Sequence, residues 1–299
     1  MVTRDPSILV AHSEKTVLPK LEFFHSIGMP PHDIALVTSR TPRILRCSLE
    51  NCIIPFYGYL KNLLQSDEKA ITVLKQARNF FLQVGLRQLP PNVAILKKYG
   101  VNESIISSLT VHYPESLMMR SDDLVKIVNR VIELGMDVSK YVFVRAINVL
   151  HCMSKSTWEA RKNAYHKWGW SESDIHMAFS IQPECMRLSE KKLMSVMEFC
   201  VNEMNCEAKA IARHPTVLLY SLEKRIMPRC RVVKLLMVKG LIEGPYNLVS
   251  LLVMTDKTFS ERFVMKYDSI PGLLDVYHGK LSLQDLGIDS SELAKAKLV

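Results

Sequence analysis

The apolar residues of this chain recur in short groups at helical spacing, and the groups repeat about every 36 residues. Pairs of apolar residues stand at matching places in successive periods: Phe23 and Phe24, Tyr59 and Leu60, Ile95 and Leu96. Such spacing places apolar side chains on one face of a helix. Because a short helical pair cannot bury that face alone, the period predicts stacked pairs that share one continuous core.

Two series of prolines follow the same period. Pro6 and Pro42 are 36 residues apart, and Pro19, Pro55 and Pro91 are each separated by 36. Proline disfavours helical geometry at the preceding residue and is tolerated in the first turn of a helix. We therefore expect the first series to follow the end of one helix and the second series to begin the next. Glycines that suit helix ends follow at Gly28, Gly100, Gly135, Gly169 and Gly240.

Residues 213–240 form the clearest copy of this unit. A short helix is expected to stop at His214, before Pro215, and a second helix is expected to run from Pro228 to Gly240. Between Lys209 and Lys239, eight Lys or Arg residues accompany the single acid Glu223. Most of the chain's net charge of +9 therefore comes from this unit.

The period predicts an all-α superhelical solenoid of about seven to eight repeats over residues 1–245, whose concave face would bind a partner. Residues 246–299 diverge from the pattern and are expected to form a capping segment.

The seven cysteines include no C-x-x-C pair, which favours buried thiols in a reducing compartment. No apolar run approaches the 18 or so residues of a membrane span. No transit segment is visible before Pro6, which suggests a mature or truncated form, or a protein made without one.

A net charge of +9 and a pI near 9.1 indicate a polyanionic partner, nucleic acid before membrane. Contact with phosphates needs Lys and Arg side chains along one face. The candidates are Arg213, Lys224, Arg225, Arg229, Arg231 and Lys234 in the seventh unit, Lys75, Arg78, Lys97 and Lys98 in the third, Arg40 and Arg43 in the second, and Arg161 and Lys162 in the fifth.

Enzyme motifs are missing from the sequence: it has no G-x-S-x-G, Walker A, G-x-G-x-x-G or H-E-x-x-H pattern. We therefore expect no catalytic residues, metal or cofactor, and neither a membrane nor a small-molecule substrate among the partners. Cys200 and Cys206 are interpreted as buried structural thiols. The aromatic residues Trp158, Tyr165, Trp168 and Trp170 are interpreted as core in preference to a base-stacking platform.

The motif Pro-x-[Ile/Leu]-Leu, followed by a Leu-x-Pro-Lys-Leu-like helix start and then a glycine, resembles the repeat of the mitochondrial transcription termination factor (mTERF) family, in its plant branch. Leu18-Pro-Lys-Leu-Glu-Phe-Phe-His-Ser-Ile-Gly28 and Pro215-Thr-Val-Leu with Met227-Pro-Arg match best. The resemblance covers about residues 1–240, with prolines missing near 78, 127 and 147. It implies a left-handed superhelix with two helices and a 3₁₀ turn per repeat, an organellar location, and nucleic-acid binding that regulates transcription or RNA processing.

We expect a monomeric protein of the organelle interior, mitochondrion before chloroplast, that binds double-stranded DNA to regulate transcription, including its termination. Organellar RNA binding for intron splicing or ribosomal RNA maturation is the alternative within the same class, and a protein-binding scaffold is the alternative of another class. Reversing the charges of Arg225, Arg229 and Arg231 together is expected to weaken binding and leave helicity intact.

Overall fold

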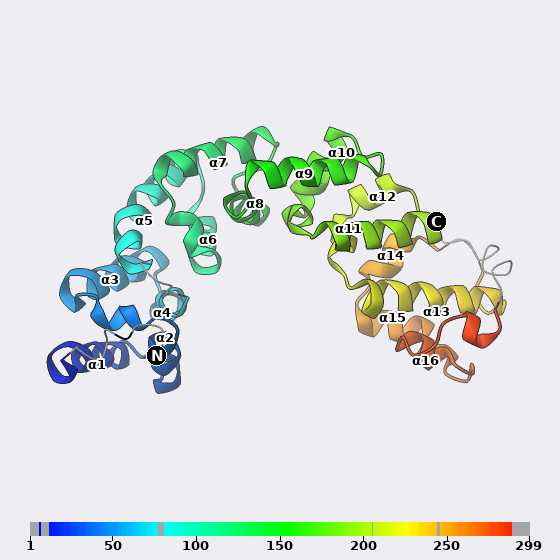
Figure 1. Cartoon of the computed structure of the whole chain (residues 1–299), viewed down its shortest axis with the longest axis horizontal. Coiled ribbons are helices and arrows are strands. Elements are labelled where there is room, and N and C mark those ends of the chain that lie inside the picture. The colour runs from blue at the N-terminus through cyan, green and yellow to red at the C-terminus, as the bar shows by residue number, and fades with distance from the viewer. Residues whose placement is uncertain (1–5, 7–11, 77–80, 205, 244–245, 289–299) are drawn as a thin grey trace. The chain divides into compact units, whose positions relative to one another are not determined.

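The computed structural model describes residues 6, 12–76, 81–204, 206–243 and 246–288. This part of the chain contains sixteen α-helices joined by short 3₁₀ and π turns (Figure 1). The predicted all-α repeat array is therefore confirmed. Among the described helices, none has both the length and the apolar character needed to cross a bilayer.

The chain divides into two compact units, Met1–His151 and Cys152–Val299. This division falls inside the predicted repeat array, well before residue 245, so the proposed separation of an array from a capping segment stays a prediction. Within each unit, the helix that precedes the turn of a repeat is called its leading helix, and the helix that follows the turn is called its trailing helix.

The first unit packs its helices in two rows. The leading helices are α2 (Pro31–Arg40), α4 (Asp67–Lys75), α6 (Glu103–His112) and α8 (Tyr141–His151). The trailing helices are α1 (Leu18–Ser26), α3 (Ile54–Leu64), α5 (Phe81–Lys98) and α7 (Ser121–Glu133). Each leading helix packs on the next one, and α3, α5 and α7 pack in the same way. Neighbouring repeats therefore bury each other's apolar faces, as the period predicted.

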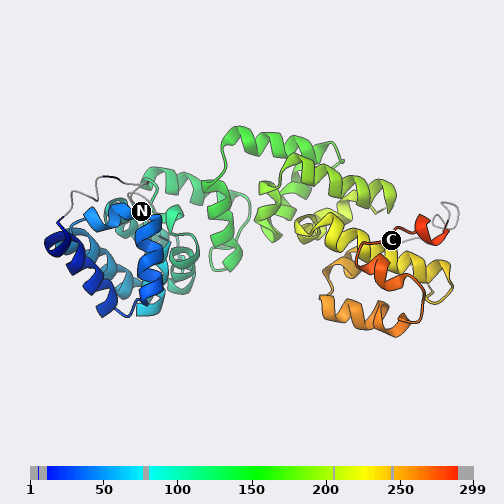
Figure 2. The same cartoon turned by 60° about the horizontal axis from the view of Figure 1, so that its bottom comes forward.

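The second unit continues the alternation. Its trailing helices are α9 (Lys155–His166), α11 (Glu190–Met197), α13 (Met227–Val238) and α15 (Asp256–Phe263). Its leading helices are α10 (Glu172–Ile181), α12 (Ala208–Arg213) and α14 (Leu248–Val253). The short helix α16 (Leu273–Tyr277) packs on α13, and the views show α14 to α16 gathered beside it (Figures 1 and 2).

The first proline series ends the leading helices, as expected. Short 3₁₀ turns begin at these prolines: η3 (Pro42–Arg46), η5 (Pro114–Leu117), η6 (Pro183–Arg187) and η8 (Pro215–Leu219). The residue before each proline is no longer in a helical conformation; His214, for example, has φ −133° and ψ 58°. The buried residues Val217 and Leu218 of η8 anchor the turn to the core. Pro6 is described, but the motif that follows it lies outside the described residues.

In the second proline series, Pro19, Pro55 and Pro228 each take the second position of a trailing α-helix, as expected. Pro91 corrects the expectation, because it lies inside α5. A π turn precedes the other three prolines: η2 (Ser13–Val17), η4 (Leu49–Ile53) and η9 (Leu222–Ile226). Ile53 and Ile226 donate their N–H groups to carbonyls five residues earlier, at Ser48 and Ser221. Because proline has no N–H, a carbonyl one turn earlier loses its partner, and a wider turn accommodates this loss. Serine caps at Ser48 and Ser221 therefore begin two of these π turns, about two turns before the proline.

The glycines end the trailing helices, as predicted. Gly28, Gly100, Gly135, Gly169 and Gly240 have positive φ values between 67° and 88°, a conformation that glycine adopts without the strain of a Cβ atom. The register of the apolar residues is also confirmed, because Phe24, Leu60, Leu96 and Val233, each five places after a proline of the second series, are fully buried.

Asn92 provides a test of the packing within the first unit. It is fully buried in α5, where its side-chain amide donates to the carbonyls of Leu117 and Met119, both at 2.8 Å, and accepts from the Ser121 hydroxyl. Asn92→Ala leaves the buried carbonyl of Leu117 and the part-buried carbonyl of Met119 without this donor, so we expect a loss of about 2–3 kcal/mol of stability. A shift of the urea unfolding midpoint would measure it.

The matched control is Asn129→Ala on α7. Asn129 is exposed and accepts one hydrogen bond from the Tyr99 hydroxyl at 2.7 Å. Its replacement is expected to change stability by at most about 0.5 kcal/mol. Equal effects of the two substitutions would contradict a special role for the buried amide.

Candidate nucleic-acid interface

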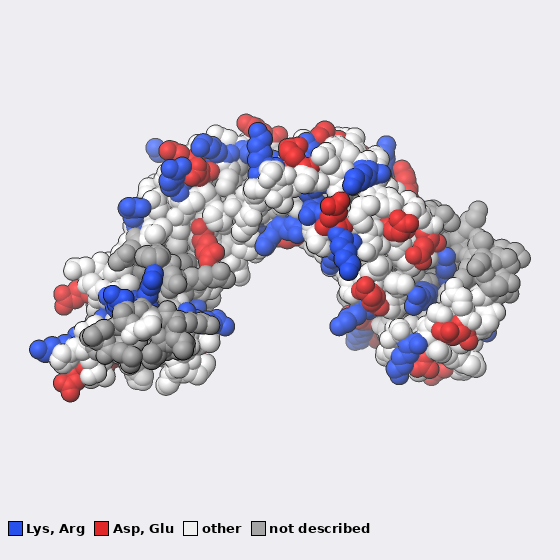
Figure 3. All heavy atoms as spheres, in the orientation of Figure 1, with Lys and Arg blue, Asp and Glu red and all other residues white. Residues whose placement is uncertain are grey.

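The predicted basic residues have very different surroundings. Arg78 lies outside the described residues, and the other thirteen can be sorted by their exposure and partners. Figure 3 shows Lys and Arg interspersed with Asp and Glu over the visible surface, without one uninterrupted basic patch. For nucleic-acid binding, the exposure of individual Lys and Arg side chains therefore matters more than the total charge.

Arg229 faces the interior. Its side chain is 1% exposed, and Nη1 donates to the carbonyls of Leu251, Leu252 and Met254 at 2.7–3.2 Å. Nη2 donates to Asp256 Oδ1 at 2.5 Å, and the guanidinium lies over the Phe259 ring, 4.7 Å from its centroid. Burial and the charge of Arg225 lower the pKa of Arg229, while the hydrogen bond to Asp256 opposes this shift. Arg229 thus holds the protein together and is not available to phosphates.

Arg225 takes part in the same structure. Its Nε and Nη2 donate to the carbonyls of Leu252 and Met254, and Nη1 donates to Asp256 Oδ1 at 3.1 Å. Its side chain is 21% exposed and stacks on the Tyr220 ring. We call Arg225, Arg229 and Asp256 the arginine clamp, which satisfies the last carbonyls of α14 and joins that helix to η9 and α13.

The arginine clamp overturns one expectation from the sequence. Reversing the charges of Arg225, Arg229 and Arg231 together would place two carboxylates against backbone carbonyls in a largely buried site. Helix packing would be lost together with any binding, so this substitution cannot leave the fold intact.

Three other candidates form ion pairs within the protein. Lys75 Nζ lies 2.7 Å from Asp33 Oδ2, Lys97 Nζ lies 2.9 Å from Glu103 Oε1, and Lys162 Nζ lies 2.7 Å from Glu172 Oε1. The Asp33 side chain is only 10% exposed, so Lys75 neutralises a nearly buried carboxylate. Lys162 is 18% exposed and also approaches Glu159. Lys75 and Lys162 therefore have evident structural roles, whereas Lys97 is half exposed.

Arg161, Arg231 and Lys234 are half-buried. Desolvation lowers the pKa of Lys234. Hydrogen bonds from Ser282 and, to a smaller extent, the charge of Arg231 lower the pKa of the Asp285 carboxyl. The remaining five candidates are exposed: Arg40, Arg43, Lys98, Arg213 and Lys224. The predicted candidates therefore separate into clamp, ion-paired, half-buried and exposed residues.

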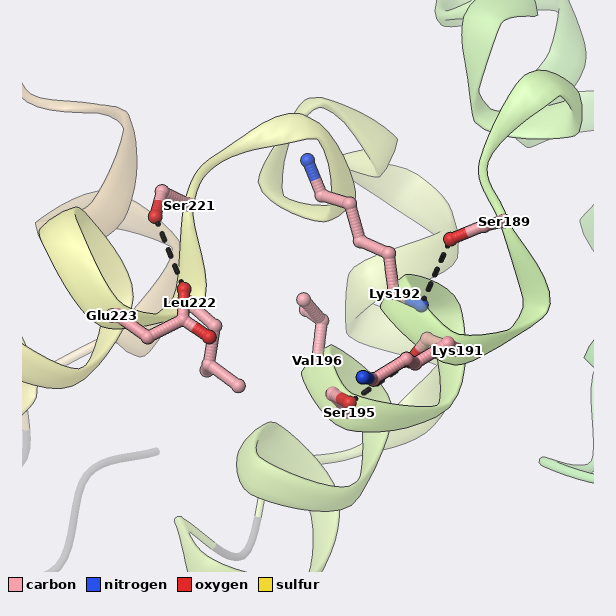
Figure 4. A pocket seen from close by; sticks show the side chains of 8 residues that line it. All are labelled: Ser189, Lys191, Lys192, Ser195, Val196, Ser221, Leu222 and Glu223. Carbon is pink, nitrogen blue, oxygen red and sulfur yellow. Dashed lines mark hydrogen bonds between the residues drawn. The ribbon is translucent and has the colours of Figure 1, made fainter.

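Two lysines that sequence reasoning missed line a pocket in the second unit. Lys191 and Lys192 lie at the start of α11, and Ser221, Leu222 and Glu223 lie opposite them at the start of η9 (Figure 4). The pocket has a volume of about 320 Å³. Lys192 Nζ donates to the Leu219 carbonyl at 2.8 Å, while Lys191 is exposed. The signal in the sequence was the pair of short Ser-x-x-Lys motifs, Ser189 to Lys192 and Ser221 to Lys224.

The aromatic cluster lies in the core, as preferred from the sequence. Trp158 and Trp170 are 3% and 2% exposed, and Tyr165 is fully buried. Tyr165 stacks on Trp170 with ring centroids 4.4 Å apart, and its hydroxyl donates to the Cys185 carbonyl at 2.8 Å. Trp168 is half-buried and its indole N–H faces Met194 Sδ. These rings are therefore occupied by packing within the protein.

The cysteines and the acidic residues show no metal site within the described part of the chain, where no group of three His, Cys, Asp or Glu side chains could hold an ion. Cys185, Cys200, Cys206 and Cys230 are buried. Burial raises the pKa of the Cys185 and Cys200 thiols to about 12, which keeps both protonated and weakly nucleophilic.

The arginine clamp makes a stability prediction. Arg229→Met fills a similar volume but leaves the Leu251 carbonyl without its donor, while Arg225 still donates to Leu252 and Met254, so we expect a loss of about 1–3 kcal/mol. Arg213→Met is the control, because Arg213 is exposed, and should change stability by no more than about 0.5 kcal/mol. Thermal unfolding followed by circular dichroism measures both. An unchanged melting temperature for Arg229→Met would show that the clamp contributes little.

Comparisons with known proteins agree with the repeat pattern. The model of the mTERF family matches residues 1–260. Over 293 residues the chain is 24% identical to transcription termination factor MTEF18, mitochondrial, of Arabidopsis thaliana, covering 91% of this chain and 52% of that protein. It is 21% identical over 232 residues to transcription termination factor MTERF8, chloroplastic, of the same plant, covering 77% of this chain and 46% of that protein. The chain thus spans about half the length of these curated relatives.

Helical repeats, proline-bounded turns and the family match over most of the chain lead to one conclusion: the chain belongs to the mTERF family.

Proposed function

We propose that this protein binds nucleic acid inside an organelle and regulates transcription there, including its termination, by binding double-stranded DNA. Membership of the mTERF family carries the proposal. The relatives named above are transcription termination factors of mitochondria and chloroplasts. A net charge of +9 and exposed Lys and Arg side chains in both units add independent physical support.

The binding we propose is dominated by the phosphate backbone. Exposed cations such as Lys98, Arg213 and Lys224 lie at the surface, where phosphates can reach them. Each phosphate contact releases condensed counterions, so affinity should fall steeply as salt increases. The buried aromatic cluster argues against a stacking platform of Trp158, Tyr165 and Trp170, which a single-strand reader would use.

The same binding experiment distinguishes DNA binding from two alternatives. An RNA-binding factor for intron splicing or ribosomal RNA maturation would also use basic side chains, but it would favour single-stranded or folded RNA. A protein-binding scaffold would have an affinity that depends far less on salt. We favour the mitochondrion over the chloroplast because the relative that covers 91% of this chain carries the mitochondrial name.

A binding competition tests the proposed function. The purified chain is titrated with a labelled 30-base-pair DNA duplex at 50 mM and 200 mM salt, with unlabelled duplex or single-stranded RNA as competitors. We expect the duplex to compete better than the RNA and the affinity to fall by about tenfold or more between the two salt concentrations.

Each result has a defined meaning. Better competition by RNA would replace the DNA proposal with the RNA-processing alternative. A binding constant that hardly changes with salt would contradict backbone recognition. Lack of binding to either nucleic acid at the lower salt concentration would overturn the proposed function for this chain.

A further inference from the structure

Lysines occupy an unusual position in the second unit. Lys155 is the first residue of α9, Lys191 the second of α11, Lys224 the third of η9, and Lys257 the second of α15. All four are exposed, and successive members are 33 or 36 positions apart. We call these four residues the lysine row. The first turns of α9, α11 and α15, and the π turn η9 that precedes α13, therefore each carry an exposed positive charge.

The fold itself gains nothing from a cation at this end of a helix. The first turn of a helix carries a partial positive charge from its aligned peptide dipoles, so acidic side chains stabilise it and basic ones destabilise it. Acids that suit the fold are present beside the lysines. Asp256 binds the two arginines of the clamp, and Glu190 lies 3.4 Å from Lys167. These acids pair with cations outside the row. Lys257 approaches Glu261 at 3.9 Å within its own helix, and all four row lysines are exposed.

Contacts between the helix starts place most members of the row next to one another. Lys191 of α11 lines the same pocket as Glu223, the residue before Lys224. Arg225, the residue after Lys224, donates to Asp256, the residue before Lys257. The starts of α11, η9 and α15 are therefore consecutive neighbours on one unit, and α9 packs on α11.

The pocket between the first two of these starts offers donors on its α11 side, opposite the Glu223 carboxylate. In Figure 4, Lys191 and Ser195 lie on one side and Ser221 and Glu223 on the other, with Val196 and Leu222 between them. The Ser189 hydroxyl accepts the Lys192 N–H at 3.2 Å and keeps its own proton for donation. The Ser221 hydroxyl faces Glu223 at 3.3 Å. The Lys191 side and Ser189 thus offer donors, while Leu222 and Val196 give an apolar surface for a sugar.

We propose that the lysine row is the track along which one sugar-phosphate strand of the bound nucleic acid lies across the second unit. This inference rests on the proposed function and adds the residues that contact the backbone. The lysines are repelled by the partial positive charge of the helix starts. A bound polyanion would be attracted both by the lysines and by the helix starts, so its presence would offset this repulsion.

A lipid surface fits the row poorly. Binding to an anionic membrane needs apolar side chains beside the basic ones. The large apolar side chains exposed in the described part of the second unit are Ile181, Leu241, Val253, Met265 and Leu274, none of which lies in a first turn with a row lysine. A polymer with regularly spaced charges matches a row that offers one cation in each repeat.

The test uses the triple variant K191Q/K224Q/K257Q, whose members lie at three neighbouring helix starts. Binding of the 30-base-pair duplex, or of the RNA if RNA competes better, should weaken by at least about tenfold at 100 mM salt. The slope of log K against log salt should become less steep by about 2–3, one unit for each lost contact. The melting temperature should stay the same or rise, because unfavourable charge leaves three helix starts.

The matched control is K239Q/K266Q/K280Q, which removes the same charge from the same unit. Lys239 caps the C-terminal end of α13, the helix that η9 begins, and a cation there is favourable. Lys266 and Lys280 lie outside the first turns of the trailing helices. We expect this variant to lose less than about threefold in affinity, keep at least two thirds of the salt slope, and melt at the same or a lower temperature.

Replacing the row lysines is expected to lower affinity without lowering stability, whereas the control variant is expected to keep most of its affinity without gaining stability. Equal losses of affinity in the two variants would overturn the track, because general charge would then account for binding. Undiminished binding by K191Q/K224Q/K257Q, with wild-type binding present, would overturn it while leaving the proposed function standing. Lack of binding by the wild-type chain would overturn both.

Discussion

The missing N–H of proline is the constraint that shapes the repeats that contain it. At Pro42, Pro114, Pro183 and Pro215, proline lies just after a leading helix and turns the chain into a 3₁₀ segment. At Pro19, Pro55 and Pro228 the same missing donor lies in the first turn of an α-helix, where a π turn precedes it. One chemical property therefore gives two structures.

Much of the fold was predictable because it depends on local chemistry that repeats. The end of α12 before His214, the left-handed glycines and the buried residue five places after each second-series proline follow from backbone geometry and apolar spacing. The π turns before the trailing helices were missed, since the serine caps at Ser48 and Ser221 were overlooked, and the position of Pro91 inside α5 was missed as well. The relation between distant helices depends on contacts that no single repeat encodes.

The candidate interface was less predictable, because a basic residue can serve either the fold or a ligand. Arg225 and Arg229 have the same charge and neighbourhood in the sequence as Lys224, yet they satisfy carbonyls on α14 while Lys224 is exposed. Sequence spacing places them on one short helical segment but does not identify the acceptors, which lie more than twenty residues later. Guanidinium groups suit such multiple carbonyl contacts, whereas lysines more readily stay in solvent.

The arginine clamp also determines where the chain can be shortened. Its acceptors are the carbonyls of Leu251, Leu252 and Met254 and the carboxylate of Asp256, all beyond the repeat that resembles the family most closely. A fragment that stopped near residue 245 would keep the Arg229 cation within a helix built to enclose it, with neither counterion nor acceptor. The arginine clamp thus ties α14 to the seventh repeat, and a fragment boundary belongs beyond Asp256.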